Sequence, residues 1–385
     1  MELVEHKSKS LHELEMYVCG VVGLQLDKKD VAIPFLQGAP GCGKTALVKA
    51  WCKKYNWNLL SVHFALIPIE EISGIPFQSK IIVGKECKEV NGTEWSYPEI
   101  LTNLYNMDQS KPTILFLDDF HLCSPDHLNL GFEMFTNRAI RGYELPENTA
   151  FILAGNASSK AGTKAGNSAI INRCSINPVH MDFNHWKKSY AFPTGINPKI
   201  LSFLSNEKNR KYFHMEETTN KPWASPRSWS RFSEILNPLE EALKNNIPHQ
   251  DLIYFSESHI GSEAATEFSA YYKLYLETEM DKVFEGKKVI KIPDDMTGQY
   301  IYVLSASNEF FNYCKSNNKE KQELGYTMFS TIVTEIAKKN LSIAIIGAKE
   351  LVESGQLNQF LKFKKMITKI DPAISDRITK EIQLI

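Results

Sequence analysis

A short apolar run that ends in a glycine-rich octapeptide constrains the fold of this 385-residue chain more than any other feature. Residues 32–37 are almost all apolar, as expected of a strand buried on both faces of a parallel sheet. Pro34 cannot donate to a strand ladder, so we expect it near the beginning of this strand. The octapeptide that follows fits the pattern G-x-x-x-x-G-K-[ST] and reads Gly38-Ala39-Pro40-Gly41-Cys42-Gly43-Lys44-Thr45.

A strand, a loop of this kind and a helix starting near Lys44 together predict a phosphate-binding site. The glycines let the backbone curl so that successive N–H groups point at phosphate oxygens, and the helix N-terminus adds the positive end of its dipole. We expect Lys44 to neutralise the β and γ oxygens of ATP and the Thr45 hydroxyl to bind Mg²⁺. A chance glycine-rich turn is the alternative. The predicted nucleotide-binding residues are Gly38, Ala39, Pro40, Gly41, Cys42, Gly43, Lys44, Thr45 and Ala46.

Two further apolar runs end in polar side chains that suit the same chemistry. Residues 113–117 lead to Asp118, our second predicted Mg²⁺ ligand, and to Asp119, a candidate base or orienter for the attacking water. Residues 150–154 lead to Asn156. If the two strands are neighbours, the Asn156 amide reaches the γ-phosphate and positions water. An Asx turn at the strand end is the alternative for Asn156.

The strand-like runs, with Leu59–Leu66 as a fourth, are confined to the first half of the chain. They alternate with helical stretches at 45–55 and 126–138, which indicates a three-layer α/β domain. Beyond residue 184 the apolar periodicity is helical. We therefore predict a P-loop NTPase αβα core over residues 1–183, an all-helical lid over 184–284, and a linker with a helical C-terminal region over 285–385.

Composition narrows the functional classes. The formal net charge is -1, so there is no broad basic field for phosphate backbones, and nucleic-acid binding is not expected. The chain contains no apolar run of about 18 residues and no N-terminal signal segment, so we expect no membrane contact. Seven cysteines are scattered without a C-x-x-C pair, which is typical of free thiols in a reducing compartment. We predict a cytoplasmic protein.

These motifs, in this order, resemble the AAA+ ATPases, and more closely the MoxR-like branch, which is related to the dynein-related AAA group. Asp118-Asp119 resembles the Walker B motif of that family and Asn156 its sensor 1. The likeness covers about residues 30–270. Other similar segments are Glu70–Pro76 (an acidic turn and G-[IL]-P), Thr93–Pro98 (W-x-x-P), Ile171–Arg173 (an N-R element), Trp223–Trp229 (sensor 2) and Gly261–Phe268 (a lid helix).

The resemblance implies roles for two arginines. Arg173 would be an arginine finger that completes the site of a neighbouring subunit, and such a residue is worth about 10³–10⁵ in rate. Arg227 would be sensor 2. The sequence itself supports its placement, because Ser225 can cap a helix and Pro226 suits the first helical position. A surface ion pair is the alternative for each arginine. One departure concerns Asp119, where the family usually has Glu, so the water is placed differently or hydrolysis is slow.

The resemblance also implies partners: a homo-oligomeric ring, expected to be a hexamer, a protein client, and a partner with a von Willebrand factor A domain. We hypothesise that an insert at residues 77–95 contacts the client, with Asn91-Gly92 as a type I′ hairpin turn. A solvated surface hairpin is the alternative for this insert. A second hairpin is expected around residues 141–146.

Three other functions stay open at this point. A small-molecule kinase would share the loop, but it needs an acceptor pocket and a lid with several arginines. A DNA-handling AAA+ motor is disfavoured by the near-neutral charge. An oligomeric scaffold that binds ATP with little hydrolysis is the third. The interpretation that we carry forward is an ATP- and Mg²⁺-dependent AAA+ ring ATPase.

Overall fold

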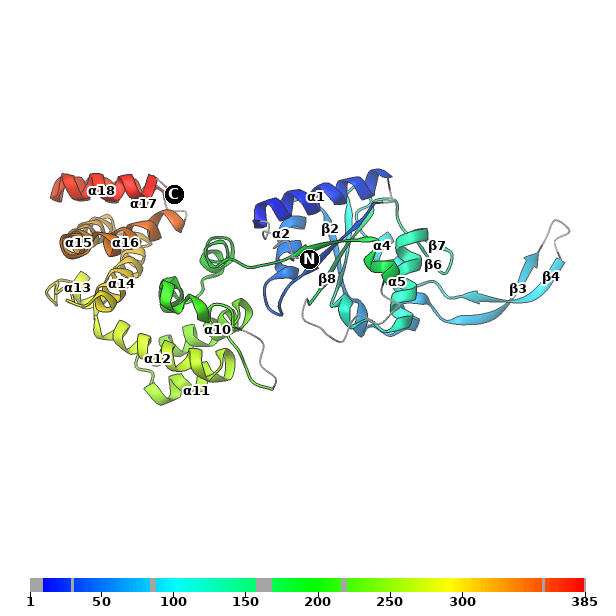
Figure 1. Cartoon of the computed structure of the whole chain (residues 1–385), viewed down its shortest axis with the longest axis horizontal. Helices are drawn as coiled ribbons and strands as arrows, with labels where there is room; N and C mark the ends of the chain where they lie inside the picture. The colour runs from blue at the N-terminus through cyan, green and yellow to red at the C-terminus, as the bar shows by residue number, and fades with distance from the viewer. Residues whose placement is uncertain are drawn as a thin grey trace, which may run out of the picture. The chain divides into compact units, whose positions relative to one another are not determined.

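The computed structural model of the chain describes residues 10–28, 31–83, 88–156, 168–215, 220–354 and 357–383. The chain divides into two compact units, Met1–Met181 and Asp182–Ile385 (Figure 1). The finer division of the second unit, into a lid and a C-terminal region, stays a prediction.

A five-stranded parallel sheet with the order β2-β5-β8-β1-β9 forms the centre of the first unit. Every residue of β5 and β8 is buried, which explains why both strands are apolar from end to end. The strands are β1 (Ile33–Gln37), β2 (Asn58–His63), β5 (Thr113–Asp118), β8 (Thr149–Gly155) and β9 (Cys174–Pro178). Pro34 is the second residue of β1, as predicted.

Different helices cover the two faces of the sheet, and strand side chains alternate between them. One face packs against α1 (Leu11–Lys28) and α2 (Lys44–Tyr55), and it is lined by Leu36, Ile114, Phe116, Ala150, Ile152 and Ala154. The other packs against α3 (Ile69–Ser73), α4 (Glu99–Tyr105) and α5 (Pro125–Asn137), and it is lined by Phe35, Leu115, Leu117, Phe151 and Leu153. A short helix, α6 (Ser168–Ile171), precedes β9. The predicted αβα core is confirmed.

The sheet differs from the prediction at two strands. The expected strand Leu59–Leu66 ends at His63, and a 3₁₀ turn, η1 (Phe64–Leu66), follows it. Strand β9 was not predicted at all. It lies at the edge of the sheet, only one of its five residues is buried, and it ends in proline, so it lacks the apolar run that marks the inner strands.

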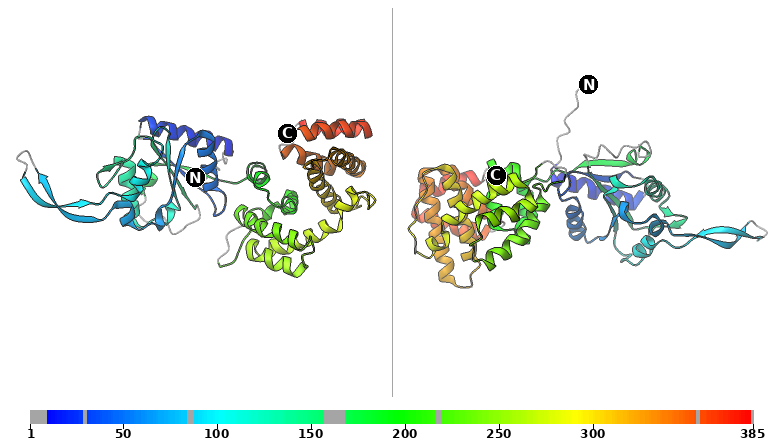
Figure 2. Two further views of the ribbon diagram at one scale, coloured as in Figure 1. Left: turned by 180° about the vertical axis from the view of Figure 1, so that it is seen from behind. Right: turned by 90° about the horizontal axis from the view of Figure 1, so that it is seen from below.

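A long antiparallel hairpin, β3 (Pro76–Val83) with β4 (Lys88–Trp95), projects from the first unit (Figures 1 and 2). The hairpin was predicted, but its turn was placed wrongly. Asn91 pairs with Lys80 and Gly92 with Ser79, so both lie inside β4, and the connection at 84–87 is outside the described residues. Gly92 has a packing role instead: a Cβ there would lie 2.3 Å from the Ile81 side chain.

The second, shorter hairpin lies where it was expected. It consists of β6 (Ala139–Ile140) and β7 (Tyr143–Glu144), which pair antiparallel. The two residues between them, Arg141 and Gly142, both have positive φ, 51° and 86°. That combination is the requirement of a type I′ turn.

Helices are the only regular elements in the described part of the second unit. Its aromatic core includes Trp229, which is fully buried and lies within 5.8 Å of the Phe203 and Phe268 ring centroids. The first group of helices is α7 (Phe183–Trp186), π-helix η4 (Lys187–Ala191), α8 (Phe192–Thr194), α9 (Pro198–Ser205), 3₁₀ helix η5 (Glu207–Tyr212), α10 (Pro226–Ala242), α11 (His249–Ile260), α12 (Ser262–Glu277) and α13 (Met280–Phe284).

The later helices of this unit pack around a second apolar cluster that includes Phe310, Phe329 and Phe363. They are α14 (Met296–Cys314), α15 (Lys319–Lys339), α16 (Leu341–Glu353), α17 (Leu357–Ile370) and α18 (Pro372–Gln383). None of the helices in the described residues combines the length and the apolar character that a membrane crossing requires.

One buried polar side chain completes the sheet. Strand β1 pairs with β8 only from the Phe35–Leu153 pair onward, so Phe151 has no β1 neighbour. Gln25 of α1, 1% exposed, takes that place: its amide donates to the Phe151 carbonyl (3.1 Å) and accepts from the Phe151 N–H (2.9 Å). The side chain thus supplies both hydrogen bonds that a further strand residue would make.

We predict that Gln25→Ala lowers the free energy of unfolding by about 2–4 kcal/mol, because it leaves two buried backbone groups without partners. His12→Ala, at an exposed position of the same helix, is the control and should change it by less than about 0.5 kcal/mol. Urea denaturation measures both. Equal, small effects of the two substitutions would contradict the role assigned to Gln25.

Candidate nucleotide-binding site

The carboxyl ends of three neighbouring strands lie side by side at one end of the sheet. Strand β1 leads into the glycine-rich loop, β5 ends at Asp118, and β8 leads to Asn156. The neighbourhood of β5 and β8, on which the prediction for Asn156 depended, is confirmed. Ligands of open α/β sheets characteristically bind just beyond the carboxyl ends of the strands.

The loop, residues 38–43, needs glycine for two separate reasons. Gly41 and Gly43 have left-handed backbones, with φ of 76° and 94°. Gly38 is needed for space, because a Cβ there would lie 2.6 Å from the Val179 carbonyl oxygen. Cys42 is buried, and its N–H donates to the Ala39 carbonyl at 3.3 Å. These contacts curl the backbone tightly between β1 and α2.

Helix α2 begins at Lys44, as predicted, and Gly43 caps it without a side-chain hydrogen bond. Many other helices begin with a side chain that accepts a hydrogen bond from one of their first N–H groups. The N-terminus of α2 carries the positive end of the helix dipole, which favours an anion at this place. Ala46, the last predicted loop residue, is the third residue of this helix and is exposed.

Lys44 is buried at the centre of the site, with 7% of its surface exposed. Its Nζ donates to the carbonyls of Gly38 (2.9 Å) and Ala39 (3.2 Å) and to the Asn156 Oδ1 (3.0 Å). The ammonium group and the Asn156 amide therefore already lie together. A phosphate group on the loop would meet both.

Thr45 and Asp118 form the second pair. The Thr45 Oγ1 donates to the Asp118 Oδ2 at 2.6 Å, and the other Asp118 oxygen accepts from the Asp119 N–H at 2.9 Å. Hydroxyl and carboxylate oxygens are the donors that Mg²⁺ prefers, with waters and phosphate oxygens completing its shell. Within the described residues no group of three or more His, Cys, Asp or Glu side chains could hold a metal. The two oxygens fit Mg²⁺ that arrives with a nucleotide.

Asp119 lies just beyond the strand with a left-handed backbone, φ 53°, and its side chain is 36% exposed. Its Oδ2 lies 3.4 Å from the Nδ1 of His63, the last residue of β2. Prediction from sequence missed His63. The predicted strand continued to Leu66, so His63 was expected inside the strand and not at its end.

A second histidine was also missed. The Asn156 N–H donates to the Nδ1 of His121 at 3.3 Å, so that nitrogen must be unprotonated. Partial burial lowers the pKa of His121, and Lys44 adds to the effect, although Asp119 and Asp118 oppose it. A neutral His121 therefore holds the Asn156 backbone. His121 follows Asp119 by two positions in the sequence, and this closeness to a predicted catalytic residue could have identified it as a site residue.

The first of the two predicted arginines lies elsewhere in the first unit. Arg173 stands at the amino end of β9, where its carbonyl accepts from the Ile33 N–H at 2.9 Å, and its guanidinium lies over the Phe132 ring at 4.4 Å. Arg173 therefore lies at the amino ends of the strands, whereas Gly38 lies at their carboxyl ends, roughly 15 Å away along the five residues of β1. The structure does not bring Arg173 to its own loop.

Arg227 belongs to the second unit, in the first turn of α10. The predicted cap is present: the Ser225 Oγ accepts from the Ser228 N–H (3.2 Å), the Ser228 Oγ accepts from the Ser225 N–H (2.7 Å), and Pro226 occupies the first helical position. This capping box fixes the turn that carries the exposed Arg227 side chain. Its role as a sensor stays a prediction.

Comparisons with known proteins agree with this geometry over the first unit. Residues 34–161 match the family described as "ATPase family associated with various cellular activities (AAA)". The matched span includes the loop, Asp118, Asp119 and Asn156, and it ends before Arg173 and Arg227. No match was found among curated proteins.

Solved structures give weaker likenesses. A single-residue mutant of Thermotoga maritima RuvB is 11% identical, with a TM-score of 0.37, over 83% of this chain and 89% of that chain. Cdc6p from Pyrobaculum aerophilum is 12% identical, with a TM-score of 0.38, over 88% of each. Nothing about activity follows from similarity at this level. The family match and the loop geometry agree: residues 34–161 are similar to the AAA ATPase family, and this span holds the glycine-rich loop and the strand ends that face it.

Proposed function

We propose that this protein binds ATP with Mg²⁺ at the loop and hydrolyses it as an AAA+ ATPase. One observation carries the proposal: Lys44 and Thr45 are hydrogen-bonded to Asn156 and Asp118, the polar residues at the ends of β8 and β5. The loop would hold the phosphates, and the Thr45 and Asp118 oxygens would bind Mg²⁺, which neutralises charge on the β and γ oxygens.

Asp119 would act on the water that attacks the γ-phosphate. Its left-handed backbone separates it from Asp118, so the two adjacent carboxylates take different roles. Asp118 is 6% exposed and bonded to Thr45, whereas Asp119 remains open to solvent beside His63. A positioned general base contributes about 10²–10⁴ in rate. Asn156, held by His121, would orient the same water.

We predict that Asp119→Asn lowers the ATP turnover number by about 10²–10³, because the amide cannot accept the proton. Nucleotide affinity should stay within about threefold, since Asp119 makes no contact with the Lys44 ammonium or the Thr45 hydroxyl. Phosphate release measures turnover and calorimetry measures affinity. Asp126→Asn, at an exposed site in the first turn of α5, is the matched control. Unchanged turnover in Asp119→Asn would show that Asp119 is not the base.

Arg173 supports a shared active site. Arg173 lies at the amino ends of the strands and its own loop lies at their carboxyl ends, so it can reach a γ-phosphate only on another subunit. Stacking over Phe132 holds its exposed side chain at the surface. We therefore propose a ring of identical subunits, a hexamer by resemblance to the MoxR-like branch, with ATP at each subunit boundary and Arg173 as the arginine finger.

Arg173→Ala is expected to lower turnover per subunit by about 10³ or more, because transition-state charge is no longer neutralised. Mixing two inactive variants gives the sharper test. Arg173→Ala keeps a complete loop, and Lys44→Ala keeps a complete Arg173, so mixed assemblies should regain activity at their shared boundaries. Absence of any recovery in the mixture, with both variants shown to assemble, would contradict action between subunits.

The long hairpin β3–β4 is the proposed client contact. Both strands are solvent-exposed along most of their described length, and Phe77 and Ile82 are 47% and 72% exposed. Exposed apolar side chains on a projecting element are typical of protein contacts. With the MoxR-like resemblance, this supports coupling of ATP turnover to remodelling of a protein client, together with a von Willebrand factor A domain partner. Arg227 would couple turnover to motion of the 184–284 lid.

Deletion of residues 80–91 shortens the hairpin to the three pairs from Pro76–Trp95 to Gln78–Thr93 and leaves Ser79-Gly92 as a two-residue turn. We expect the shortened protein to keep its basal ATP turnover within about twofold, because no residue of the site is touched. Crosslinking of client proteins at position 77 should be lost. A loss of basal turnover would contradict a purely client-binding role.

An oligomeric scaffold that binds ATP with little hydrolysis is the second candidate. The observation that favours it is the short Asp119 side chain, which is also engaged by His63 at 3.4 Å. Retention of ATP for hours by the assembled wild-type protein, without phosphate release, would identify the scaffold.

A further inference from the structure

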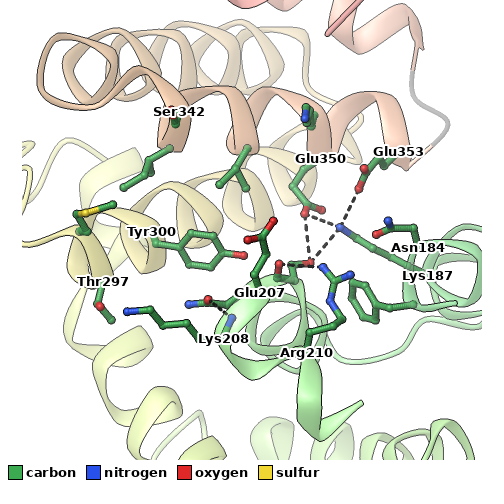
Figure 3. Close-up of a pocket in the computed structure, with 17 residues that line it drawn as sticks. Asn184, Lys187, Glu207, Lys208, Arg210, Thr297, Tyr300, Ser342, Glu350 and Glu353 are labelled. Carbon is green, nitrogen blue, oxygen red and sulfur yellow. Dashed lines mark hydrogen bonds and ion pairs between the residues drawn. The ribbon is translucent and has the colours of Figure 1, made fainter. Parts of the chain in front are cut away.

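A cavity of about 520 Å³ lies within the second unit (Figure 3). Its walls come from α7, the residues around the start of η5, the first turn of α14, and α16. Small-molecule sites commonly have volumes of about 300–1,000 Å³. The size is therefore that of a ligand site, and none of the predicted nucleotide-binding residues lines it.

One wall is a complete ion network that needs no ligand. Lys187 is 2% exposed, and its Nζ contacts Glu350 (2.5 Å), Glu353 (3.2 Å) and Ser205 (3.1 Å). It joins η4 to α16 across 163 positions of the chain. Two carboxylates around one ammonium leave this network with a net negative charge, so Lys187 does not attract an anion.

Three other cations around the cavity are not compensated. Among the described residues, Arg210 donates only to the backbone carbonyls of Leu204 (3.0 Å) and Ser205 (3.2 Å), and it lies over the Phe183 ring at 4.3 Å. In the part of the chain that the structure describes, neither Arg210 nor Lys208 nor Lys349 has a carboxylate within ion-pair distance. These contacts fix the Arg210 guanidinium while leaving part of its donor fork unused.

Tyr300 adds an independent sign of a ligand. It is 8% exposed, and its hydroxyl has no hydrogen-bond partner among the described residues. Figure 3 shows this hydroxyl pointing into the cavity toward Glu207. Burial raises the pKa of Tyr300 well above its usual range, so the hydroxyl is protonated and can donate. The hydroxyls of Tyr272 and Tyr302 also lack a partner among the described residues, but of the three tyrosines Tyr300 is the one that lines the cavity, where a ligand can supply the missing hydrogen bond.

We propose that this cavity binds a small anion, a carboxylate or a phosphate, held by the Arg210 guanidinium and the Tyr300 hydroxyl. Lys208 and Lys349 at the rim would add favourable charge. Glu207 would accept a hydrogen bond from a hydroxyl or amino group on the same ligand, which favours an anion that also carries a donor. The site shares no residue with the nucleotide site and does not depend on the proposed ATPase activity.

Calorimetric titration of the full chain with citrate and, separately, with inorganic phosphate tests the proposal. Lys44→Ala is used as the background, so that the glycine-rich loop does not compete for phosphate. We expect at least one anion to bind with a Kd of about 1 mM or tighter. Citrate alone identifies a carboxylate site, and phosphate alone identifies a phosphate site. Binding of neither would overturn the proposal.

Substitutions locate the binding. Arg210→Gln should weaken it by about 10–100-fold and Tyr300→Phe by about tenfold, as expected when hydrogen bonds to a charged group are lost. Tyr302→Phe is the matched control: it lies two residues further along α14, is buried and does not line the cavity. It should leave the affinity unchanged. Equal affinities in the parent, Arg210→Gln and Tyr300→Phe proteins would overturn the proposal.

Thermal unfolding separates binding from folding. Tyr300→Phe removes a hydroxyl that has no partner among the described residues, so the unfolding midpoint without ligand should stay the same or rise. The anion should then raise the midpoint less than it does in the parent. A lower midpoint without ligand, with an unchanged rise on adding the anion, would show that the hydroxyl is structural and contradict its role in the site.

Discussion

Two hydrogen bonds join the first turn of α2, which follows the glycine-rich loop, to the ends of two other strands: Lys44 to Asn156 and Thr45 to Asp118, at 3.0 and 2.6 Å. They can form only because β1, β5 and β8 are parallel and adjacent, so that their carboxyl ends meet. The ammonium, hydroxyl, carboxylate and amide groups are thereby held within one small region. Preorganised charge of this kind is the main means by which phosphoryl transfer is catalysed.

The arrangement explains why the site was largely predictable from sequence. Strands β5 and β8 are buried throughout, so each appears as an apolar run that stops at a polar residue. The Arg227 turn was predictable for a similarly local reason, since Ser225 and Pro226 specify a helix start. Where the determinant is the burial of one strand or the cap of one helix, the local sequence is sufficient.

Features set by contacts between distant segments were not predictable. Strand β9 is exposed and acquires its place only by pairing with β1. His63 reaches Asp119 because β2 neighbours β5, and Gly92 serves Ile81 across the hairpin where a turn was expected. The Lys187 network and the cavity beside it depend on segments far apart in the chain. Such contacts cannot be predicted from the periodicity or the motifs of a single stretch of sequence.

The most direct test is the affinity of Lys44→Ala for ATP with Mg²⁺, measured by calorimetry beside the parent. Lys49→Ala, an exposed lysine on the same helix, provides the matched control. We predict a loss of roughly 10²-fold or more for Lys44→Ala, because the phosphates lose the buried cation of the loop, and no change for Lys49→Ala. An affinity of Lys44→Ala within twofold of the parent would contradict the account.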